Sequence, residues 1–368
     1  MGERITAIYR VKDRAENIQA RAHTIAVEQS VEMPVSAITK QSVLDEIVGE
    51  VQAIRDLGGG VFEIAIGLAV STTGLEAGQT LNMLFGNSSI HADMVLHDAI
   101  FPAEVRRAFA GPHHGLEGLR KRVGAEGRAL TCSALKPQGL SPQELAALAA
   151  QFARGGIDYI KDDHGLADQA YSPFAERVPA VAEAVRAAQG KVPTRYLPSL
   201  SGNLDQLRRQ IDVVRQAGLD GALIAPMIVG IPSFHALKRE NPDIAFMAHP
   251  AMAGAARIAP PFLLGKLFRL LGADATVFPN HGGRFGYTPD ECRALAGAAL
   301  ESWGDIKPCI PVPAGGMTTD RVPEMLDFYG TDVMLLIGGG LLAAGERLAE
   351  ETAAFVEAVH AHGKDERR

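Results

Sequence analysis

The chain has 368 residues, 47% of them hydrophobic, and a net charge of −7. A mean hydropathy of +0.05 and a pI near 5.9 predict a globular protein with ample core material, and they argue against nucleic acid or an anionic membrane as its main partner. Because the first residues lack a signal-peptide pattern and the three cysteines show no CxxC spacing, we expect free thiols and a cytoplasmic location.

Residues 1–113 have the pattern of a small α+β domain. An alternating stretch, ITAIYRV, is followed by the helical-looking AENIQARAHTIAVEQS and the strand-like GGGVFEIAIGLAV. Strands and helices grouped in this way favour a mostly antiparallel sheet, of the ferredoxin-like kind. We therefore expect a separate N-terminal α+β domain.

Residues 114–368 show the alternation of a (β/α)₈ barrel, also called a TIM barrel. Amphipathic stretches such as SPQELAALAAQFARGG and NLDQLRRQIDVVRQAGLD begin with good helix N-caps and separate short apolar runs. An open Rossmann-type sheet is the alternative, but the G-x-G-x-x-G that it needs does not occur. The candidate strands are 129–137, 157–163, 194–200, 221–228, 244–250, 275–280, 310–316 and 333–340.

Reactive side chains in such barrels lie at the carboxyl ends of the strands. Six of the predicted strand ends carry polar or glycine-rich residues, and this convergence predicts a catalytic centre. The residues are Lys136, Lys161, Asp162, Asp163, His164, His249, Asn280, His281, Gly315, Gly316 and Gly338–Gly340.

The glycines after the last two strands indicate a phosphate site. Glycine lets backbone N–H groups turn towards an anion and lets a phosphate approach closely. The candidate phosphate-binding residues are therefore Gly315, Gly316, Gly339 and Gly340. Arg284 has a guanidinium group that could also bind the phosphate. The alternatives are simple tight turns and a solvated arginine.

The run Lys161-Asp162-Asp163-His164 offers ligands for a divalent cation. Strand alternation sends Lys161 and Asp163 to one side and Asp162 to the other, so Asp162 is expected to be structural. A purely structural ion pair between Lys161 and Asp163 is the alternative.

Around these residues the chain resembles the RuBisCO large-chain family. GGIDYIKDDH is similar to the signature G-G-x-D-x-x-K-D-D-E, and ALKPQGLS is similar to the catalytic K-P-K-x-G-L-S. AGPHHGL, LNMLFGNSS, AVEQSVEMP, VPAGGM and LLIGGG resemble further family segments in the same order, from about residue 5 to 345.

The resemblance implies roles for individual residues. Lys136 corresponds to a proton-handling lysine, and Lys161 corresponds to the lysine that CO₂ converts to a carbamate. That carbamate and Asp163 would bind one Mg²⁺ per site. Glu28 and Asn87 correspond to residues that the N-terminal domain of one subunit offers to its partner's barrel, which implies a homodimer with shared sites. His249 matches the fifth-strand histidine.

Departures from the family pattern imply a RuBisCO-like protein of form IV that does not fix CO₂. Gln138 replaces a lysine, His164 replaces a glutamate ligand, Pro250 replaces an arginine and Ala314 replaces a serine. The loop FPNHGGRFGYTPDE lacks the lysine that stabilises the carboxylated intermediate. His164 also leaves the identity of the metal open.

The remaining residues predict an enolase-type isomerase acting on a phosphorylated ketose. Lys136 would abstract a proton, His249 or His281 would return one, and a cation held by Lys161, Asp163 and His164 would stabilise the enediolate. The resemblance suggests 5-methylthioribulose 1-phosphate of methionine salvage. The alternatives are a decarboxylase or hydrolase of a 3-oxo sugar-acid phosphate, of the 3-oxo-isoapionate 4-phosphate type, and a non-enzymatic binding or regulatory protein.

Overall fold

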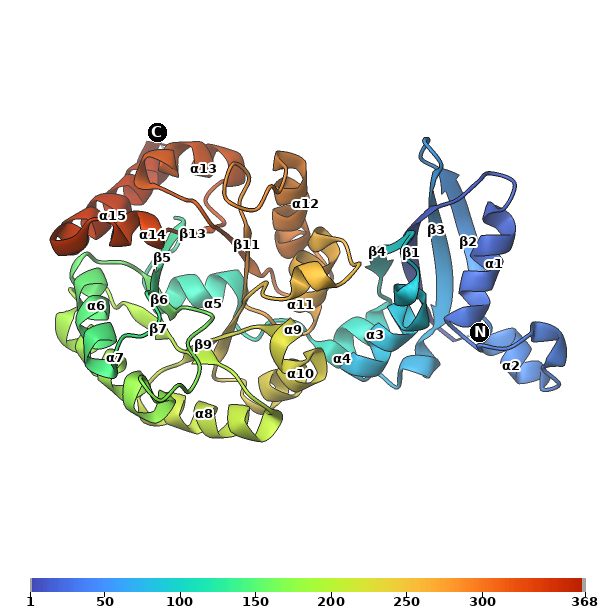
Figure 1. Cartoon of the computed structure of the whole chain (residues 1–368), viewed down its shortest axis with the longest axis horizontal. Helices are drawn as coiled ribbons and strands as arrows, with labels where there is room; N and C mark the ends of the chain where they lie inside the picture. Colours follow the sequence, from blue (N-terminus) through green and yellow to red (C-terminus); the bar gives the residue numbers. More distant parts are fainter. Residues whose placement is uncertain (1, 366–368) are drawn as a thin grey trace. The chain divides into compact units, whose positions relative to one another are not determined.

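The computed structural model describes residues 2–365 and separates the chain into two compact units (Figure 1). Of these residues, the first unit comprises 2–110 with Met252–Leu263 and Gly304–Ile306, and the second comprises the remaining segments. No helix among the described residues is both long and apolar enough to cross a membrane.

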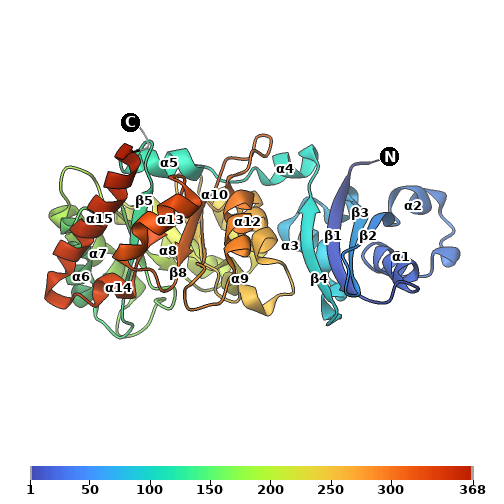
Figure 2. The same ribbon diagram turned by 90° about the horizontal axis from the view of Figure 1, so that it is seen from above.

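The first unit contains an antiparallel sheet of strand order β2-β3-β1-β4. Burial alternates along β1 and β3, so one face of each strand packs in the core and the other meets solvent. Helix α1 packs against the sheet at β2 and β3 (Figure 2). This arrangement is the α+β domain predicted from the sequence. Its elements are β1 (Arg4–Lys12), α1 (Ile18–Glu28), α2 (Gln41–Glu46), β2 (Glu50–Asp56), β3 (Val61–Ala69), α3 (Ala77–Phe85), β4 (Met94–Ile100) and α4 (Ala103–Phe109).

The second unit is the predicted parallel barrel. Its strands form the runs β13-β5-β6-β7 and β12-β11-β10-β9-β8, and contacts of β12 with β13 and of β7 with β9 close the ring. The strands are β5 (Leu130–Leu135), β6 (Tyr159–Asp162), β7 (Arg195–Leu197), β8 (Ser199–Leu200), β9 (Gly221–Ile224), β10 (Ala245–Ala248), β11 (Ala275–Pro279), β12 (Ile310–Ala314) and β13 (Met334–Leu336).

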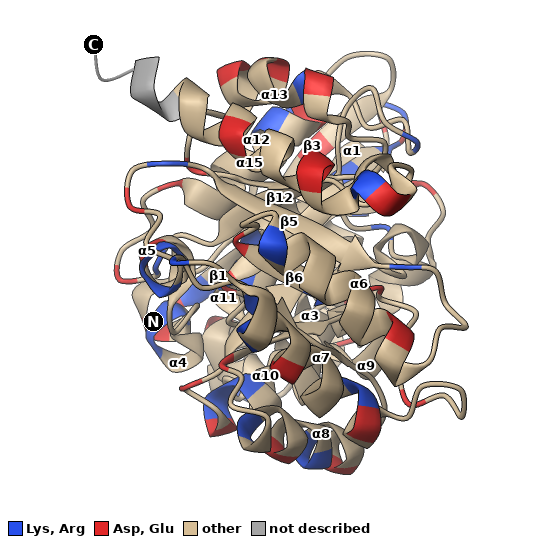
Figure 3. Cartoon of the chain, turned by 90° about the vertical axis from the view of Figure 1, so that its left-hand side faces the viewer, with Lys and Arg blue, Asp and Glu red and all other residues tan. Residues whose placement is uncertain are grey.

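Helices surround these strands, and the predicted N-caps Ser141 and Asn203 form capping boxes at α6 and α8. Acidic and basic residues are interspersed along α8 (Figure 3). Arg208 of this helix pairs at 2.7 Å with Glu240, the last residue of α10. The helices are α5 (Gly115–Arg122), α6 (Pro142–Arg154), α7 (Phe174–Ala188), α8 (Leu204–Gln216), α9 (Pro226–Val229), α10 (Ile231–Glu240), α11 (Phe268–Leu270), α12 (Pro289–Leu300), α13 (Val322–Tyr329), α14 (Gly339–Leu342) and α15 (Leu348–Asp365).

Apolar side chains fill the interior of the barrel, and α5 contributes to that core through Leu116 and Leu119. The hydroxyl of Tyr159, at the start of β6, donates to the Leu119 carbonyl at 2.8 Å. Helix α5 therefore packs at the amino end of the strands, which leaves the carboxyl ends for loops.

Two predicted strands extend too far. The strand expected over 221–228 ends at Ile224, because Pro226 begins the short helix α9. The strand expected over 333–340 ends at Leu336, and Gly339 begins α14. Proline at a first helical turn and glycine just before one both favour a helix start over a continued strand.

Candidate active site

The register between β5 and β6 brings Lys136 and Asp163 together. Leu135 pairs with Asp162, and the ladder continues through the Asp163 N–H, which donates to the Leu135 carbonyl at 3.2 Å. One residue beyond the paired ends, the Lys136 Nζ lies 2.5 Å from the Asp163 Oδ2. Two of the predicted site residues therefore form an ion pair at the carboxyl end of the barrel.

Asp163 is the centre of a hydrogen-bonded cluster. Its Oδ1 accepts from the His164 Nδ1 at 2.9 Å and from the Gly165 N–H at 3.1 Å. Burial raises the pKa of Asp163, but the hydrogen bonds from His164, Lys136 and Gly165 outweigh it and hold that pKa below its usual range. Asp163 is therefore a carboxylate at neutral pH.

Two histidines stack beside this carboxylate. The rings of His164 and His249 are nearly parallel, at 10°, with their centroids 4.2 Å apart. Burial, with smaller contributions from Lys161 and His164, lowers the pKa of His249 to about 2. A neutral imidazole from β10 thus lies against the end of β6.

Lys161 lies in an environment that favours the neutral form of its amine. Its side chain is buried, and its Nζ donates to the Asp162 carbonyl at 3.0 Å. Burial lowers the pKa of Lys161, and the Lys136 charge adds to this, whereas Cys132 and Asp163 act in the opposite direction. Only a neutral amine attacks CO₂, so burial at this position favours the reaction.

Asp162 points away from this cluster, in agreement with the strand alternation. Its carboxylate accepts from the Tyr196 hydroxyl at 2.7 Å and from the Ser199 N–H at 3.0 Å, and it pairs with the buried Arg177 at 3.3 Å. Asp162 and Arg177 are both completely inaccessible to solvent. This network joins β6 to α7 and β8 and serves the fold.

The glycine loops follow the neighbouring strands β12 and β13. Gly315 and Gly316 follow β12 with φ of 88° and 86°, a region that side chains of other residues rarely adopt. A Cβ placed on Gly338 would lie 4.0 Å from the Lys136 Cε, so the loop after β13 adjoins the lysine. Gly339 and Gly340 open α14, where the first backbone N–H groups of a helix have no intrahelical partner.

His281 and Arg284 follow β11 and make other contacts. The His281 ring lies 4.5 Å from the Phe328 ring, and burial lowers the pKa of this histidine. The Arg284 guanidinium lies 5.2 Å from the centroid of Phe285. Within residues 2–365, no ion pair joins either residue to the cluster around Asp163.

Glu28 and Asn87 lie together in the first unit. The Asn87 Nδ2 donates to the Glu28 Oε1 at 3.0 Å and to the Glu32 Oε1 at 3.1 Å. The sequence gives no signal for Glu32, which lies beyond the end of α1 with a φ of 50°. The structure thus brings together the two residues predicted to serve a partner's barrel.

Two further neighbours of the site were missed. The Gln138 side chain lies so close to Gly165 that no Cβ fits there. Phe285 packs on Gly315, where a Cβ would lie 3.3 Å from two ring atoms. The sequence shows Gln138 only as a replacement for a family lysine. It shows Phe285 only as an apolar residue in a polar loop, so neither contact is predictable from it.

The predicted metal ligands fit a cation only with a modified lysine. Among the described residues, no group of three or more His, Cys, Asp and Glu side chains is placed to hold an ion. Asp163 and His164 supply two donors, and a carbamate on the neighbouring Lys161 would supply the third. One carboxylate, one carbamate and one imidazole suit a divalent ion.

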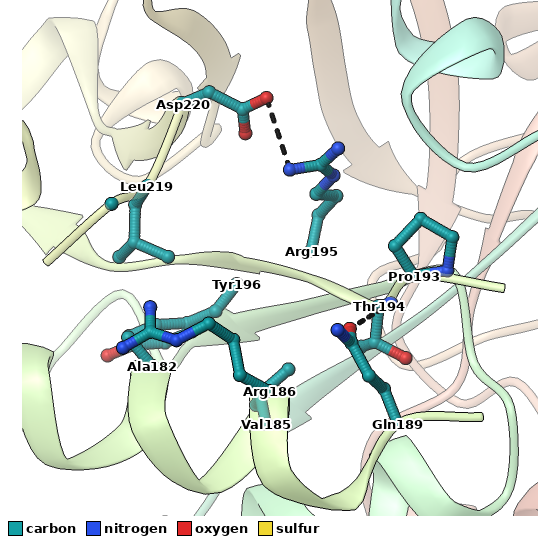
Figure 4. Close-up of a pocket in the computed structure, with 11 residues that line it drawn as sticks. Ala182, Val185, Arg186, Gln189, Pro193, Thr194, Arg195, Tyr196, Leu219 and Asp220 are labelled. Atoms are coloured by element: carbon teal, nitrogen blue, oxygen red, sulfur yellow. Dashed lines mark hydrogen bonds and ion pairs between the residues drawn. The ribbon is translucent and has the colours of Figure 1, made fainter. Parts of the chain in front are cut away.

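A hollow of about 140 Å³ lies elsewhere, beside the amino ends of β7 and β9 (Figure 4). Its polar groups bond to each other: Arg195 pairs with Asp220 at 3.4 Å, and Gln189 accepts from the Thr194 N–H at 3.0 Å. Reacting groups of barrel enzymes lie at the carboxyl ends of the strands. The hollow is therefore separate from the candidate site.

Comparison with known proteins identifies the family of the chain. Residues 115–366 match the family model for the ribulose bisphosphate carboxylase large chain, catalytic domain. The chain is 59% identical over 364 residues to 5-methylthioribulose-1-phosphate isomerase of Rhodospirillum rubrum, covering 98% of this chain and 97% of that protein. It is 56% identical over 367 residues to ribulose bisphosphate carboxylase-like protein 1 of Rhodopseudomonas palustris, covering 99% and 100%.

The fold is shared as well. The crystal structure of a Rubisco-like protein from Rhodopseudomonas palustris superimposes with a TM-score of 0.92 at 53% identity, and 99% of each chain is covered. The match therefore includes the N-terminal unit that the family model leaves out. The chain belongs to the RuBisCO large-chain family, as a RuBisCO-like protein.

Proposed function

We propose that this protein is an enolase-type isomerase acting on 5-methylthioribulose 1-phosphate. The observation that carries the proposal is the cluster at the ends of β5 and β6, where Lys136 and His164 contact the Asp163 carboxylate beside the buried Lys161. The substrate follows from the relative of that name, at 59% identity over 98% of the chain.

The reaction transfers a proton between neighbouring carbons. The Lys136 amine takes a proton from the carbon beside the substrate carbonyl, and returning a proton to the adjacent carbon completes an isomerisation with no net oxidation. The Lys136 ammonium group that results holds this proton and can return it, while a neutral His249, held against His164, is suited to hydrogen-bond a substrate oxygen. Mg²⁺ held by the Lys161 carbamate, Asp163 and His164 would supply Lewis acidity for the C–H ionisation.

We do not expect this protein to carboxylate its substrate. The loop between β11 and α12 contains Arg284 and no lysine. The Arg284 guanidinium lies against Phe285, 5.2 Å from its centroid. A carboxylated intermediate would therefore lack the lysine cation that stabilises its new negative charge.

The active unit in this proposal is a homodimer. Glu28, which is half-buried, and Asn87, which is exposed, bond to each other in the first unit. The family resemblance assigns them to the barrel of a partner subunit. Each subunit would then complete the site of the other.

Proton exchange in D₂O tests the function directly. Wild-type protein with Mg²⁺ and bicarbonate should exchange a carbon-bound proton of 5-methylthioribulose 1-phosphate and form an isomer, followed by ¹H NMR. Lys136→Met should abolish exchange, whereas Lys191→Met, at an exposed lysine in the loop before β7, should not.

Other outcomes would support the alternatives. Release of CO₂ from a 3-oxo sugar-acid phosphate without isomerisation would identify a decarboxylase. Absence of exchange with every ketose phosphate, together with an unchanged cellular phenotype of Lys136→Met, would identify a binding or regulatory protein.

A further inference from the structure

The loops after β5 and β6 touch at a second place beyond the ion pair of Lys136 and Asp163. The ladder of the two strands ends one residue before this ion pair. Two residues further along each loop, the Gln138 side chain covers Gly165. The register of β5 and β6 therefore continues into the loops as two successive side-chain contacts.

The contact between Gln138 and Gly165 is close. The Gln138 amide nitrogen occupies the place where a Cβ of residue 165 would stand. The φ of Gly165 is not in the left-handed region, so the backbone itself would accept an alanine. A Cβ at residue 165 would therefore displace the Gln138 amide, and the present position of that amide depends on the glycine.

Gly165 supplies one hydrogen bond of the candidate site. Its N–H donates to the Asp163 Oδ1 at 3.1 Å, which also accepts from the His164 Nδ1 at 2.9 Å. The Gly165 carbonyl accepts from the Gln169 side chain at 2.7 Å. Both partners of Gly165 belong to the loop that contains it, so these two hydrogen bonds do not fix the loop against β5. The Gln138 side chain comes from the loop after β5, and its contact does.

We propose that Gln138 is a positioning residue, which keeps the Gly165 N–H on the Asp163 carboxylate by packing over Gly165. This inference rests on the proposed function and deepens it, because Asp163 is the carboxylate that Lys136 contacts in the proposed reaction. A displacement of a reacting group by about 1 Å can lower a rate about 100-fold. Gln138 is itself exposed, so its removal should affect the site far more than the stability of the fold.

The position of the Gly165 N–H can be measured without substrate or metal. Four glycines follow a histidine in the sequence, so histidine labelled with ¹³C at its carbonyl, combined with ¹⁵N-glycine, isolates four backbone N–H signals in NMR. Gly165→Ala removes one of these signals and thereby assigns it. In Gln138→Ala the Gly165 signal should shift and exchange faster with water, whereas the other signals should not change. An unchanged Gly165 signal overturns the positioning role.

Kinetics test whether this contact matters for the reaction. Gln138→Ala should lower kcat for 5-methylthioribulose 1-phosphate roughly 10- to 100-fold and leave KM within about 3-fold, because the reacting groups and not substrate binding are disturbed. Gln138→Met, which keeps a long side chain over Gly165, should restore most of kcat. Gln216→Ala, at an exposed glutamine at the end of α8, is the control and should change neither constant. A higher KM at unchanged kcat, or no recovery in Gln138→Met, would show that the amide binds substrate and would overturn the positioning role.

A double variant tests the contact itself. Gly165→Ala should displace Gln138 and lower kcat as Gln138→Ala does. The two changes together should be no worse than either alone, whereas independent effects would multiply and would overturn the proposal. Gly297→Ala, at an exposed glycine of α12 with open space for a Cβ, is the matched control and should leave kcat unchanged.

The NMR signal and the kinetics separate this inference from the proposed function. If the Gly165 signal responds to Gln138→Ala but wild type exchanges no substrate proton, Gln138 still positions the Gly165 N–H and the isomerase assignment fails. If wild type is an isomerase and Gln138→Ala leaves kcat unchanged, the proposed function stands and the role of Gln138 fails, whether or not the signal shifts. Circular dichroism confirms that each variant is folded.

Discussion

Replacing Asp162 by asparagine tests whether this residue stabilises the fold, in contrast to its neighbour Asp163, for which we propose a role in the reaction. The Asp162 carboxylate receives hydrogen bonds from Tyr196 at 2.7 Å and from the Ser199 N–H at 3.0 Å, and it faces Arg177 at 3.3 Å. Burial raises the pKa of Asp162, while the Arg177 charge and the two hydrogen bonds act in the opposite direction. The substitution keeps the shape and removes the charge.

The expected loss of stability follows from the Arg177 guanidinium that remains. Arg177 is completely buried, so its charge would lose its carboxylate partner without gaining water. Breaking one partner of a buried pair costs about 3–5 kcal/mol. At about 2–4 °C for each kcal/mol, this predicts a decrease in Tm of roughly 6–20 °C.

The matched control is Asp163→Asn, one residue further along the chain. Its partner Lys136 has a side chain that is 39% exposed, so water can solvate the freed ammonium group. We expect Asp163→Asn to lower stability less than Asp162→Asn does, because it leaves no charge completely buried without a partner, and to abolish proton exchange. Differential scanning calorimetry at one fixed protein concentration measures both variants. A wild-type Tm for Asp162→Asn, or an equal decrease for both variants, would refute the reasoning.

Three more predictions concern modification, pH and assembly. In ¹³C-bicarbonate, wild type should show a carbamate ¹³C resonance that Lys161→Met lacks, and a resonance that persists in the variant would place the carbamate elsewhere. Burial lowers the pKa of Lys238 from 10.5 to about 8, so the unfolded chain binds the extra proton between these pH values. The free energy of unfolding of wild type relative to that of Lys238→Met, followed through Tm, should therefore rise by up to about 3 kcal/mol across pH 8 to 10.5 and stay level below pH 8. A difference between the two proteins that does not change with pH would contradict this. Finally, Asn87→Ala and Lys136→Met subunits, each expected to be inactive alone, can be unfolded together and reassembled. The mixture should recover about a quarter of wild-type activity, because half of the dimers are mixed and each mixed dimer has one intact site of two. No recovery would argue against shared sites.

The sequence predicted those parts of the fold that local pattern controls. Alternating burial in β1 and the capping boxes at Ser141 and Asn203 depend on residues close in the chain, and their signals are strong. Strand alternation likewise predicted that the side chains of Asp162 and Asp163 point to opposite sides of the strand. Each of these predictions needed only the two-residue period of a strand or the first turn of a helix.

Contacts between distant segments were not predictable in this way. The sequence does not show that Phe285 packs on Gly315, because that contact depends on how two loops of the barrel approach each other. It also does not show that Lys136 pairs with Asp163, since the β5–β6 register sets that distance. The family resemblance supplied the roles of Lys136 and Asp163 but not their ion pair.

The positions of Lys136 and Asp163 suggest how one barrel supports different reactions. In the proposed reaction, proton abstraction depends on Lys136 and Asp163, which the register of β5 and β6 brings together. The loop after β11 contacts the loop after β12 through the backbone of Gly283, Gly315 and Gly316. Neither loop belongs to the β5–β6 ladder, so related barrels can vary these loops and keep the same charged cluster. For this reason we place the proposed proton abstraction on the ends of β5 and β6.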